Sequence, residues 1–202
     1  HPDLHVGAAG ADAGPLRARF GHLSPYPVLA DPLDPGGPPA IDFGFHQLWV
    51  PTVLPGFEKA LPGDTVTLET ARAGSPRARL RTDKPRLWTY VARRLRAIDG
   101  DTLEAVVDLG LGHRARPRLR LRGIDCPELY THAGRTARAF VEQALAPVDF
   151  AIVTTWRTDT YGRYLADVKY LPNEADPTAI LAQGTYLNGR LLREKLATRY
   201  LE

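Results

Sequence analysis

Cysteine is nearly absent from this sequence: Cys126 is the only one among 202 residues. A single cysteine excludes a disulfide framework within the chain, so packing of the core must supply the stability. It is also a poor zinc site, because zinc ligands come in sets of cysteines and histidines at defined spacings. Four histidines are scattered over the first part of the chain without such spacing: His1, His5, His22 and His46.

Long apolar runs are also missing. No stretch of about 18 apolar residues occurs, which is the length that a membrane-spanning helix requires. The chain begins HPDLHVGAAG, with neither an initiator methionine nor a charged-then-apolar leader, so either a leader was removed or the sequence is an excerpt of a longer protein. We expect a soluble protein without a membrane partner. The sequence does not indicate its compartment or its oligomeric state.

The N-terminal region is rich in proline and glycine. Residues 1–80 contain 12 Pro and 10 Gly, whereas the remaining 122 residues contain 14 of the two together. This composition disfavours helices and favours loops and short strands. We therefore expect residues 1–40 to form loops or a partly disordered arm. A small β-rich module is expected to follow, because Ile41, Phe43 and Phe45 occupy alternate positions.

A domain boundary is expected near Pro85, which interrupts regular structure before the segment LWTYVARRLRAI. The prediction is an N-terminal region at 1–84, of unknown role, and a second domain at 85–202. Charge is divided in a similar way. Residues 1–80 carry 6 Lys and Arg against 8 Asp and Glu, a net charge of −2, while residues 81–202 carry 20 against 15, a net charge of +5. The basic surplus suits a polyanionic partner.

Charged residues form their most informative pattern between positions 97 and 129. Two acidic motifs, DGD at 99–101 and DCPE at 125–128, bracket an extended segment. Within that segment apolar residues recur at every second position: Leu103, Ala105, Val107, Leu109, Leu119 and Leu121. This period of two is typical of β-strands. A hairpin of two such strands would bring both acidic motifs to one end of a sheet.

Carboxylates brought together in this way have a chemical use. Asp101 and Asp125 offer the oxygen ligands that a hard divalent cation such as Ca²⁺ or Mg²⁺ prefers. Arg120 adds a fixed cation that can hold phosphate oxygens, and Glu128 can orient or deprotonate a water. Together these groups suit hydrolysis of a phosphodiester. The alternative is structural, since Asp-Gly is a common hairpin turn and alternating arginines often form a solvated strand face.

The rest of the chain alternates between helical and extended patterns. An apolar stripe at helical spacing predicts a helix that ends at Pro147: Ala137, Phe140, Val141, Ala144 and Leu145. Residues 148–156 and 164–170 are expected to form two strands joined by the turn RTDTYGR. Residues 171–184 look like an insertion with its own short helix, and a last helix is expected at 187–197.

Four short motifs occur in order along this part of the chain: IDGDT at 98–102, LRLRGIDCPE at 119–128, TDTYGRYLA at 158–166 and LNGRLLREKLA at 187–197. In this order and spacing they resemble the staphylococcal nuclease (thermonuclease) family, over about residues 88 to 202. The resemblance implies a mainly β fold, in which helices pack on a five-stranded OB-fold barrel. It also implies Ca²⁺-dependent cleavage of DNA and RNA. The barrel would follow an N-terminal region that is either β-poor or a small β-rich module.

The resemblance also implies roles for single residues. Three side chains would act in catalysis: Arg120, Glu128 and Arg163. Three residues would hold Ca²⁺, the last of them through its backbone carbonyl: Asp101, Asp125 and Cys126. Two tyrosines would bind the substrate: Tyr161 and Tyr200. Asp99 is expected to orient the turn or the waters of the metal, and Asn188 is expected to be structural, through hydrogen bonds to the backbone.

This sequence departs from the family's pattern at three places. The loop after Glu128 is short and lacks the family's lysine-bearing loop over the substrate. Thr160 replaces a lysine that precedes the phosphate-binding tyrosine. The family's tyrosine beyond the last helix falls at Leu201 in a gapless alignment, so Tyr200 is a neighbouring candidate. These departures affect the expected substrate preference more than the expected chemistry.

Two other functions compete with that of a nuclease. OB-folds also bind single-stranded nucleic acid without cleaving it, so the domain could be a catalytically weak module that binds nucleic acid or protein. That function predicts missing catalytic groups, whereas all five side chains are present: Asp101, Arg120, Asp125, Glu128 and Arg163. In the other alternative, residues 1–80 bind a partner and the nuclease is their effector.

Overall fold

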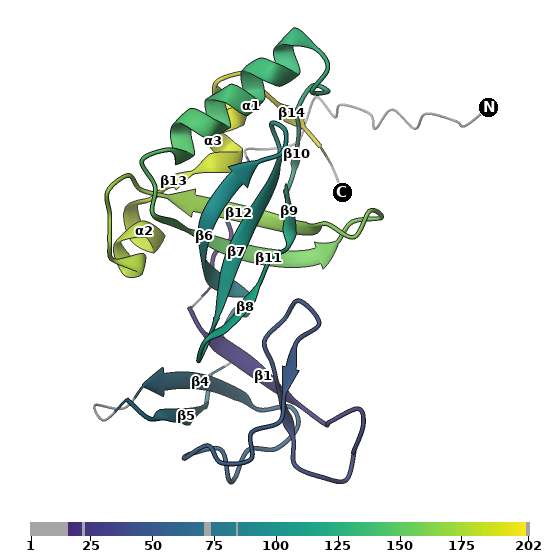
Figure 1. Ribbon diagram of the computed structural model, residues 1–202, viewed down its shortest axis with the longest axis vertical. Coiled ribbons are helices and arrows are strands. Elements are labelled where there is room, and N and C mark those ends of the chain that lie inside the picture. The colour runs from purple at the N-terminus through teal and green to yellow at the C-terminus, as the bar shows by residue number, and fades with distance from the viewer. Residues whose placement is uncertain (1–15, 22, 71–73, 84, 201–202) are drawn as a thin grey trace, which may run out of the picture. The chain divides into compact units, whose positions relative to one another are not determined.

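The computed structural model describes residues 16–21, 23–70, 74–83 and 85–200 (Figure 1). These residues are mainly β-structure with three helices. They pack as two compact units. The first unit holds the described residues of 1–19, 92–106 and 116–202, and the second holds those of 20–91 and 107–115. The predicted division of the sequence between residues 84 and 85 stays a prediction.

Five strands form a closed barrel. They are β6 (Thr89–Ala97), β7 (Thr102–Gly110), β9 (Arg118–Leu121), β11 (Phe150–Thr158) and β12 (Tyr164–Tyr170). Neighbouring strands follow the order β11-β6-β7-β9-β12, and β11 pairs with β12 to close the barrel. β9 and β12 run parallel, whereas β7 and β9 are antiparallel. The predicted mainly β fold with a five-stranded OB-type barrel is therefore confirmed.

The alternating pattern of the sequence becomes the inside and outside of the barrel. In β7, Leu103, Ala105, Val107 and Leu109 are at most 3% exposed, while the residues between them are less buried from Glu104 onward. In β9, Leu119 and Leu121 are buried and the arginines alternate with them. Burial of these apolar side chains fixes which face of each strand is turned inward, because a slip by one residue would expose all of them.

Three short strands extend this framework. β8 (His113–Ala115) pairs with the end of β7, and β13 (Thr185–Tyr186) pairs with β12. β10 (Ile124–Asp125) pairs with β14 (Thr198–Arg199), with Asp125 opposite Thr198. This last pairing fixes the position of the chain just before residues 126–128.

Helix α1 (His132–Leu145) begins after the N-cap Thr131, whose side chain accepts a hydrogen bond from the N–H of Gly134. Its buried residues fall on one stripe: Gly134, Ala137, Val141 and Leu145. α2 (Pro177–Gln183) lies in the predicted insertion and has Asp176 as its N-cap. No helix among the described residues has the length and apolar character that crossing a membrane demands.

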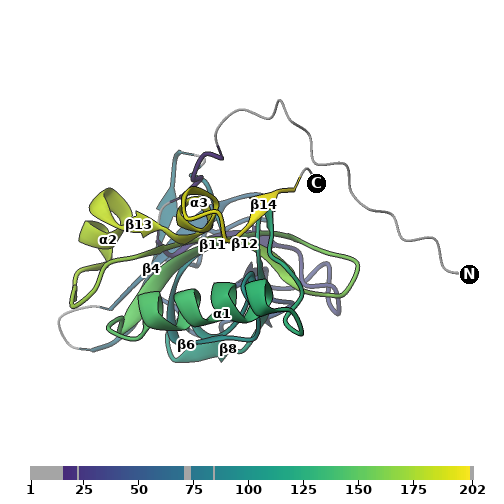
Figure 2. The same ribbon diagram turned by 90° about the horizontal axis from the view of Figure 1, so that it is seen from above.

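Helix α3 (Leu187–Arg193) is shorter than the helix expected at 187–197. Lys195 has a φ of +58°, and the N–H of Leu196 bonds back to the carbonyl of Leu191. A left-handed residue with such a backward bond terminates a helix. The guanidinium of Arg190 in α3 lies 4.8 Å above the ring of Phe140 in α1. Both helices lie at the same end of the barrel, uppermost in Figure 1 and toward the viewer in Figure 2.

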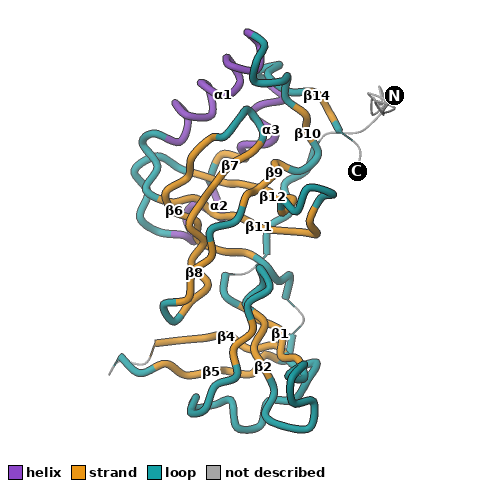
Figure 3. Tube along the Cα trace, turned by 45° about the vertical axis from the view of Figure 1, so that its right-hand side comes forward, coloured by secondary structure: helices purple, strands orange, loops and turns teal. Residues whose placement is uncertain are grey.

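The second unit contains a five-stranded antiparallel sheet. Its order is β3 (Leu48–Trp49), β2 (Ala40–Asp42), β1 (Pro25–Leu29), β4 (Thr65–Thr70) and β5 (Pro76–Arg81). The β-rich module expected after residue 40 is therefore present. In Figure 3 the described residues of this unit are drawn as strands and loops only.

Strand β1 corrects the expectation that residues 1–40 form loops or a disordered arm; residues 1–15 lie outside the described residues. β1 is the central strand of the sheet despite containing Pro25 and Pro27. Tyr26 and Val28 are 2% and 0% exposed. Burial of these two side chains outweighs the missing N–H groups of the prolines, a balance that proline content alone does not reveal.

Asn188 at the start of α3 ties the helix to the barrel. It is fully buried. Its amide NH₂ donates to the carbonyl oxygens of Arg122 (3.1 Å) and Ala166 (2.9 Å), and its side-chain oxygen accepts from the N–H of Val168 at 3.2 Å. The expected structural role of Asn188 is confirmed. One side chain thus makes three hydrogen bonds to the backbone of β12 and of the segment after β9.

Asn188→Leu should lower the free energy of unfolding by about 3 kcal/mol, because three hydrogen bonds to the backbone are lost while the volume hardly changes. Urea unfolding measures this difference. The matched control is Gln143→Leu, which replaces an exposed amide on α1. Equal stabilities of the two variants would contradict the structural role.

Candidate active site

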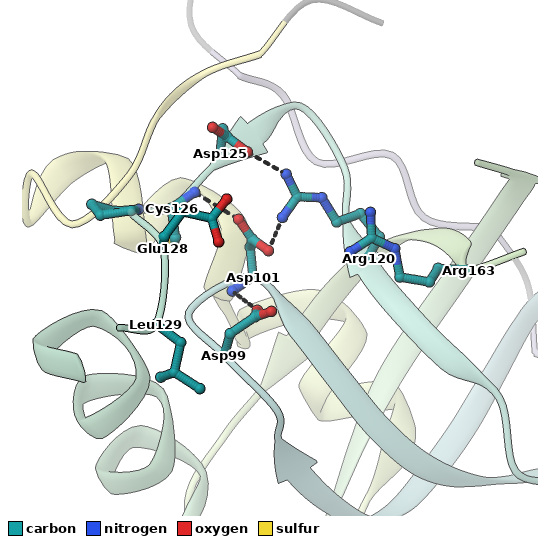
Figure 4. Close-up of a pocket in the computed structure, with 9 residues that line it drawn as sticks. Asp99, Asp101, Arg120, Asp125, Cys126, Glu128, Leu129 and Arg163 are labelled. Carbon is teal, nitrogen blue, oxygen red and sulfur yellow. Dashed lines mark hydrogen bonds and ion pairs between the residues drawn. The ribbon is translucent and has the colours of Figure 1, made fainter. Parts of the chain in front are cut away.

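A pocket of about 190 Å³ lies in the first unit, where the acidic motifs meet two arginines (Figure 4). Its lining comes from the β6–β7 turn, from β9, from the β10–α1 segment and from the β11–β12 turn: Asp99, Asp101, Arg120, Asp125, Cys126, Pro127, Glu128, Leu129 and Arg163. The structure thus brings together the predicted catalytic and metal-ligating residues, although they are spread over more than 60 positions of the sequence.

Asp101 is the buried carboxylate of the pocket, with 3% of its surface exposed. One oxygen accepts a hydrogen bond from the N–H of Cys126 at 2.6 Å, and the other forms an ion pair with Arg120. Asp99 stabilises the turn below it, because one Asp99 oxygen accepts from the N–H groups of Asp101 (3.0 Å) and Thr102 (2.7 Å). The expectation that Asp99 orients the turn is confirmed.

Arg120 lies between two carboxylates. β9 places it opposite Thr102 in the β7–β9 register. Its guanidinium forms the ion pair with Asp101 and donates to Asp125 at 2.6 Å, as the dashed lines of Figure 4 show. The Asp125 side chain is 55% exposed, whereas that of Arg120 is 14% exposed. The two carboxylates therefore create a strongly negative position that holds one cation already.

Arg163 is positioned by residues that the sequence analysis did not select. Its Nε donates to Asp159 at 2.7 Å, and its Nη1 donates to the hydroxyl of Thr102 at 3.2 Å. Asp159 also accepts from the backbone N–H groups of Tyr161 and Arg163. Burial alone would raise the pKa of Asp159, but the hydrogen bonds from Arg163 and Tyr161 outweigh it and lower that pKa. Aspartate side chains in turns commonly accept a hydrogen bond from the backbone two residues further on. The sequence RTDTYGR therefore contained the signal for the role of Asp159.

Glu128 differs from the other acidic residues of the pocket. It is exposed, and its carboxylate makes no hydrogen bond or ion pair with the described residues. Its backbone carbonyl, in contrast, is held firmly by the N–H and the hydroxyl of Thr131 at 2.9 and 2.7 Å. The side chain is therefore available to a water or a substrate, while the backbone that carries it is anchored to the start of α1.

The two predicted substrate-binding tyrosines lie outside the lining of the pocket. Tyr161 is 83% exposed, and the guanidinium of Arg163 lies 5.3 Å from the centre of its ring. Tyr200 is 44% exposed, and its N–H donates to the carbonyl of Gly123. Their roles toward a substrate stay predictions.

The donor set decides whether a metal ion fits. Within residues 16–21, 23–70, 74–83 and 85–200, no group of three or more His, Cys, Asp or Glu side chains is arranged to hold a metal. The predicted set has only two carboxylates and one backbone carbonyl, all of them hard oxygen donors of the type that Ca²⁺ accepts together with water. Burial raises the pKa of the Cys126 thiol to about 12, so the neutral thiol is a poor ligand and only the carbonyl of that residue suits a hard cation.

A five-stranded OB-type barrel whose rim carries acidic residues and two arginines defines a nuclease-like OB-fold domain. Residues 118–202 match the family model described as staphylococcal nuclease homologue. The resemblance seen in the motifs is therefore confirmed over these residues, whereas IDGDT at 98–102 lies outside the match. A comparison with curated proteins found no match.

Gly134 lets α1 start against the loop that carries Glu128. A Cβ at this position would collide with the backbone carbonyl oxygens of Pro127 and Glu128. Replacing a glycine inside a helix by alanine ordinarily stabilises it by about 1 kcal/mol. We expect Gly134→Ala to lower the free energy of unfolding in urea instead, because the loop that carries Glu128 must move to make room for the methyl group. Thr136→Ala, at an exposed position of the same helix, serves as the control. A more stable Gly134→Ala variant would contradict the close packing.

Proposed function

We propose that the domain is a Ca²⁺-dependent phosphodiesterase that hydrolyses DNA, RNA or both. The observation that carries this proposal is the pocket itself, which a free carboxylate lines together with two arginines and three further carboxylates. The family of residues 118–202 supports it, because its description names a nuclease. A binding module would need the arginines but has no use for an unpaired Glu128 beside them.

The two arginines would stabilise the charge that builds on the phosphate. In-line attack of water on a phosphodiester produces a five-coordinate phosphorus with more negative charge on its oxygens than the substrate has. Arg120 and Arg163 reach the pocket from β9 and from the β11–β12 turn. Because Arg163 is held by Asp159, little reorganisation of that side chain is needed when the charge develops.

Glu128 would orient the attacking water and accept its proton. Its carboxylate is exposed and unpaired among the described residues, so a water can reach it. The anchored backbone limits where the carboxylate can go. General-base catalysis of this kind contributes about 10²–10⁴-fold to a rate.

Asp101, Asp125 and the carbonyl of Cys126 would hold the Ca²⁺. Bound there, the ion would supply charge neutralisation at the phosphate and a more acidic water. Asp101 is fixed by the N–H of Cys126, and Asp125 is exposed and able to turn. In the structure these carboxylates share the Arg120 guanidinium, so Ca²⁺ would take its place between them and leave the guanidinium to the phosphate.

The purified protein should cleave single-stranded DNA in Ca²⁺ and fail to do so in EGTA, and Glu128→Gln should lower the rate by about 10²–10⁴-fold. Gel assays on single-stranded DNA, duplex DNA and RNA measure both effects. Glu142→Gln is the matched control, because Glu142 is an exposed carboxylate on α1 that pairs with Arg138. Retained affinity for DNA without any cleavage would favour the alternative of a binding module.

Arg163→Ala should lower the rate by about 10²–10³-fold, the usual cost of a lost donor to a developing negative charge. Arg120→Ala should lose as much activity and also stability, because the buried Asp101 then keeps its charge without the guanidinium. Single-turnover cleavage and urea unfolding separate the two effects. Arg138→Ala, on the surface of α1, is the control for both. Near-full rates in both variants would exclude the proposed roles.

A further inference from the structure

A row of arginines continues outward from the pocket along β9 and the segment just before it. Arg118 stands two residues before Arg120 and Arg116 four residues before it, and both are exposed. Alternate residues of an extended chain point to the same side. Since Leu119 and Leu121 are turned into the barrel, these arginines lie on its outer face.

The neighbouring strands bring a further arginine and an acid to this face. Glu104 of β7 stands opposite Arg118, and Arg96 of β6 donates to Glu104 at 2.7 Å. The hydrogen bond and the charge of Arg96 lower the pKa of Glu104, and the charges of Arg116 and Arg118 lower it further. The three arginines therefore gather around one carboxylate. We call Arg96, Arg116 and Arg118 the basic ridge.

The basic ridge carries surplus positive charge. Arg96 is 62% exposed and shares Glu104. Among the residues that the structure describes, Arg116 and Arg118 have no hydrogen bond or ion pair partner. Exposed guanidinium groups without a fixed partner are the usual contacts of phosphate oxygens.

The spacing of the ridge suits a chain of phosphates. Alternate residues of a strand are about 7 Å apart, so Arg118 stands about 7 Å from Arg120 along β9, and Arg116 lies just before the strand. A polynucleotide with one phosphate at Arg120 can thus place its next phosphates along the same strand. Figure 1 shows β6, β7 and β9 side by side in this part of the barrel.

Two exposed tyrosines favour a single strand over a duplex. Tyr130 and Tyr161 are 81% and 83% exposed, in the segments that follow Glu128 and precede Arg163. Proteins that hold single strands combine a basic track for the backbone with aromatic side chains on which unpaired bases stack. In a duplex the bases are stacked on each other and are not free for such contacts. The face of the second and third barrel strands, here β7 and β9, is a common binding face of OB-folds.

We propose that the basic ridge binds the backbone of a single-stranded polynucleotide beside the phosphate held at Arg120. This rests on the proposed function in one respect, namely that the pocket acts on nucleic acid. The ridge then determines how much of the strand is bound on one side of the bond to be cleaved. It makes a polynucleotide, and not a mononucleotide, the ligand that the protein binds best.

The test measures binding without cleavage. Fluorescence anisotropy follows a labelled oligothymidylate of about 12 nucleotides, within the site size of such folds, in EGTA and at several NaCl concentrations. The wild-type protein is compared with the double variant Arg116→Ala/Arg118→Ala. The control is Arg138→Ala/Arg193→Ala, which removes the same charge from helices α1 and α3. Circular dichroism verifies that both variants are folded.

We expect the ridge variant to bind roughly tenfold or more weakly at low salt. Its plot of log K against log salt should be shallower by about 1.4, since each lost phosphate contact on a single strand removes about 0.7 from the slope. The control should change much less in both respects. A ridge variant with the wild-type slope overturns the inference, as does equal affinity of the wild type for a duplex of the same length. Failure of the wild type to bind the oligonucleotide overturns it as well.

The outcomes also separate this inference from the proposed function. If binding in EGTA depends on the ridge arginines but the protein does not cleave DNA in Ca²⁺, the inference about the ridge is supported and the proposed hydrolysis is rejected. If the wild type cleaves DNA in Ca²⁺ but the ridge variant has the same salt slope as the wild type, hydrolysis is supported and the inference about the ridge is rejected.

Discussion

The ion pair between Arg120 and the buried Asp101 is the interaction on which the candidate site depends. A carboxylate that is 3% exposed is costly unless it is paired and hydrogen-bonded. Asp101 meets this demand with the guanidinium of Arg120 and the N–H of Cys126, which come from two other segments of the chain. The β6–β7 turn, β9 and the segment after β10 are thereby joined at one point. The β7–β9 register, with Arg120 opposite Thr102, determines that they can meet at all.

The same strand shows how position separates functional arginines from structural ones. Arg118 and Arg120 belong to β9, but Arg122 lies just beyond it and forms an ion pair with Asp167, which is fully buried. Burial raises the pKa of Asp167, and the hydrogen bond from Tyr186 and the charge of Arg122 act against this rise. The charge of Arg122 is thus neutralised by a buried carboxylate. Arg116 and Arg118 of the basic ridge have no ion pair partner among the described residues, so their charge is available to a ligand.

Periodicity predicts this fold well where burial is one-sided and poorly where it is not. The alternation in β7 and β9 and the four ordered motifs led to the barrel and to the residues that line the pocket. Strand β1 was missed because two prolines outweighed Tyr26 and Val28 in a reading based on composition. The ion pair of Arg120 with Asp101 is a contact across strands, and no local pattern encodes it. Thr102 was overlooked for the same reason, since its contact with Arg163 joins residues 61 positions apart.

What distinguishes the acidic residues of the pocket is their partners and not their number. Asp101 is satisfied by Arg120 and Cys126, Asp99 by the N–H groups of its own turn, and Asp125 by Arg120. A carboxylate that is already satisfied gains little by accepting a proton from water, because its hydrogen bonds stabilise the ionised form. Glu128 has an anchored backbone and an unpaired side chain among the described residues, so its carboxylate is available to a water or a substrate. Three carboxylates of the pocket are thus fixed by hydrogen bonds or ion pairs, and the fourth, Glu128, is left for chemistry.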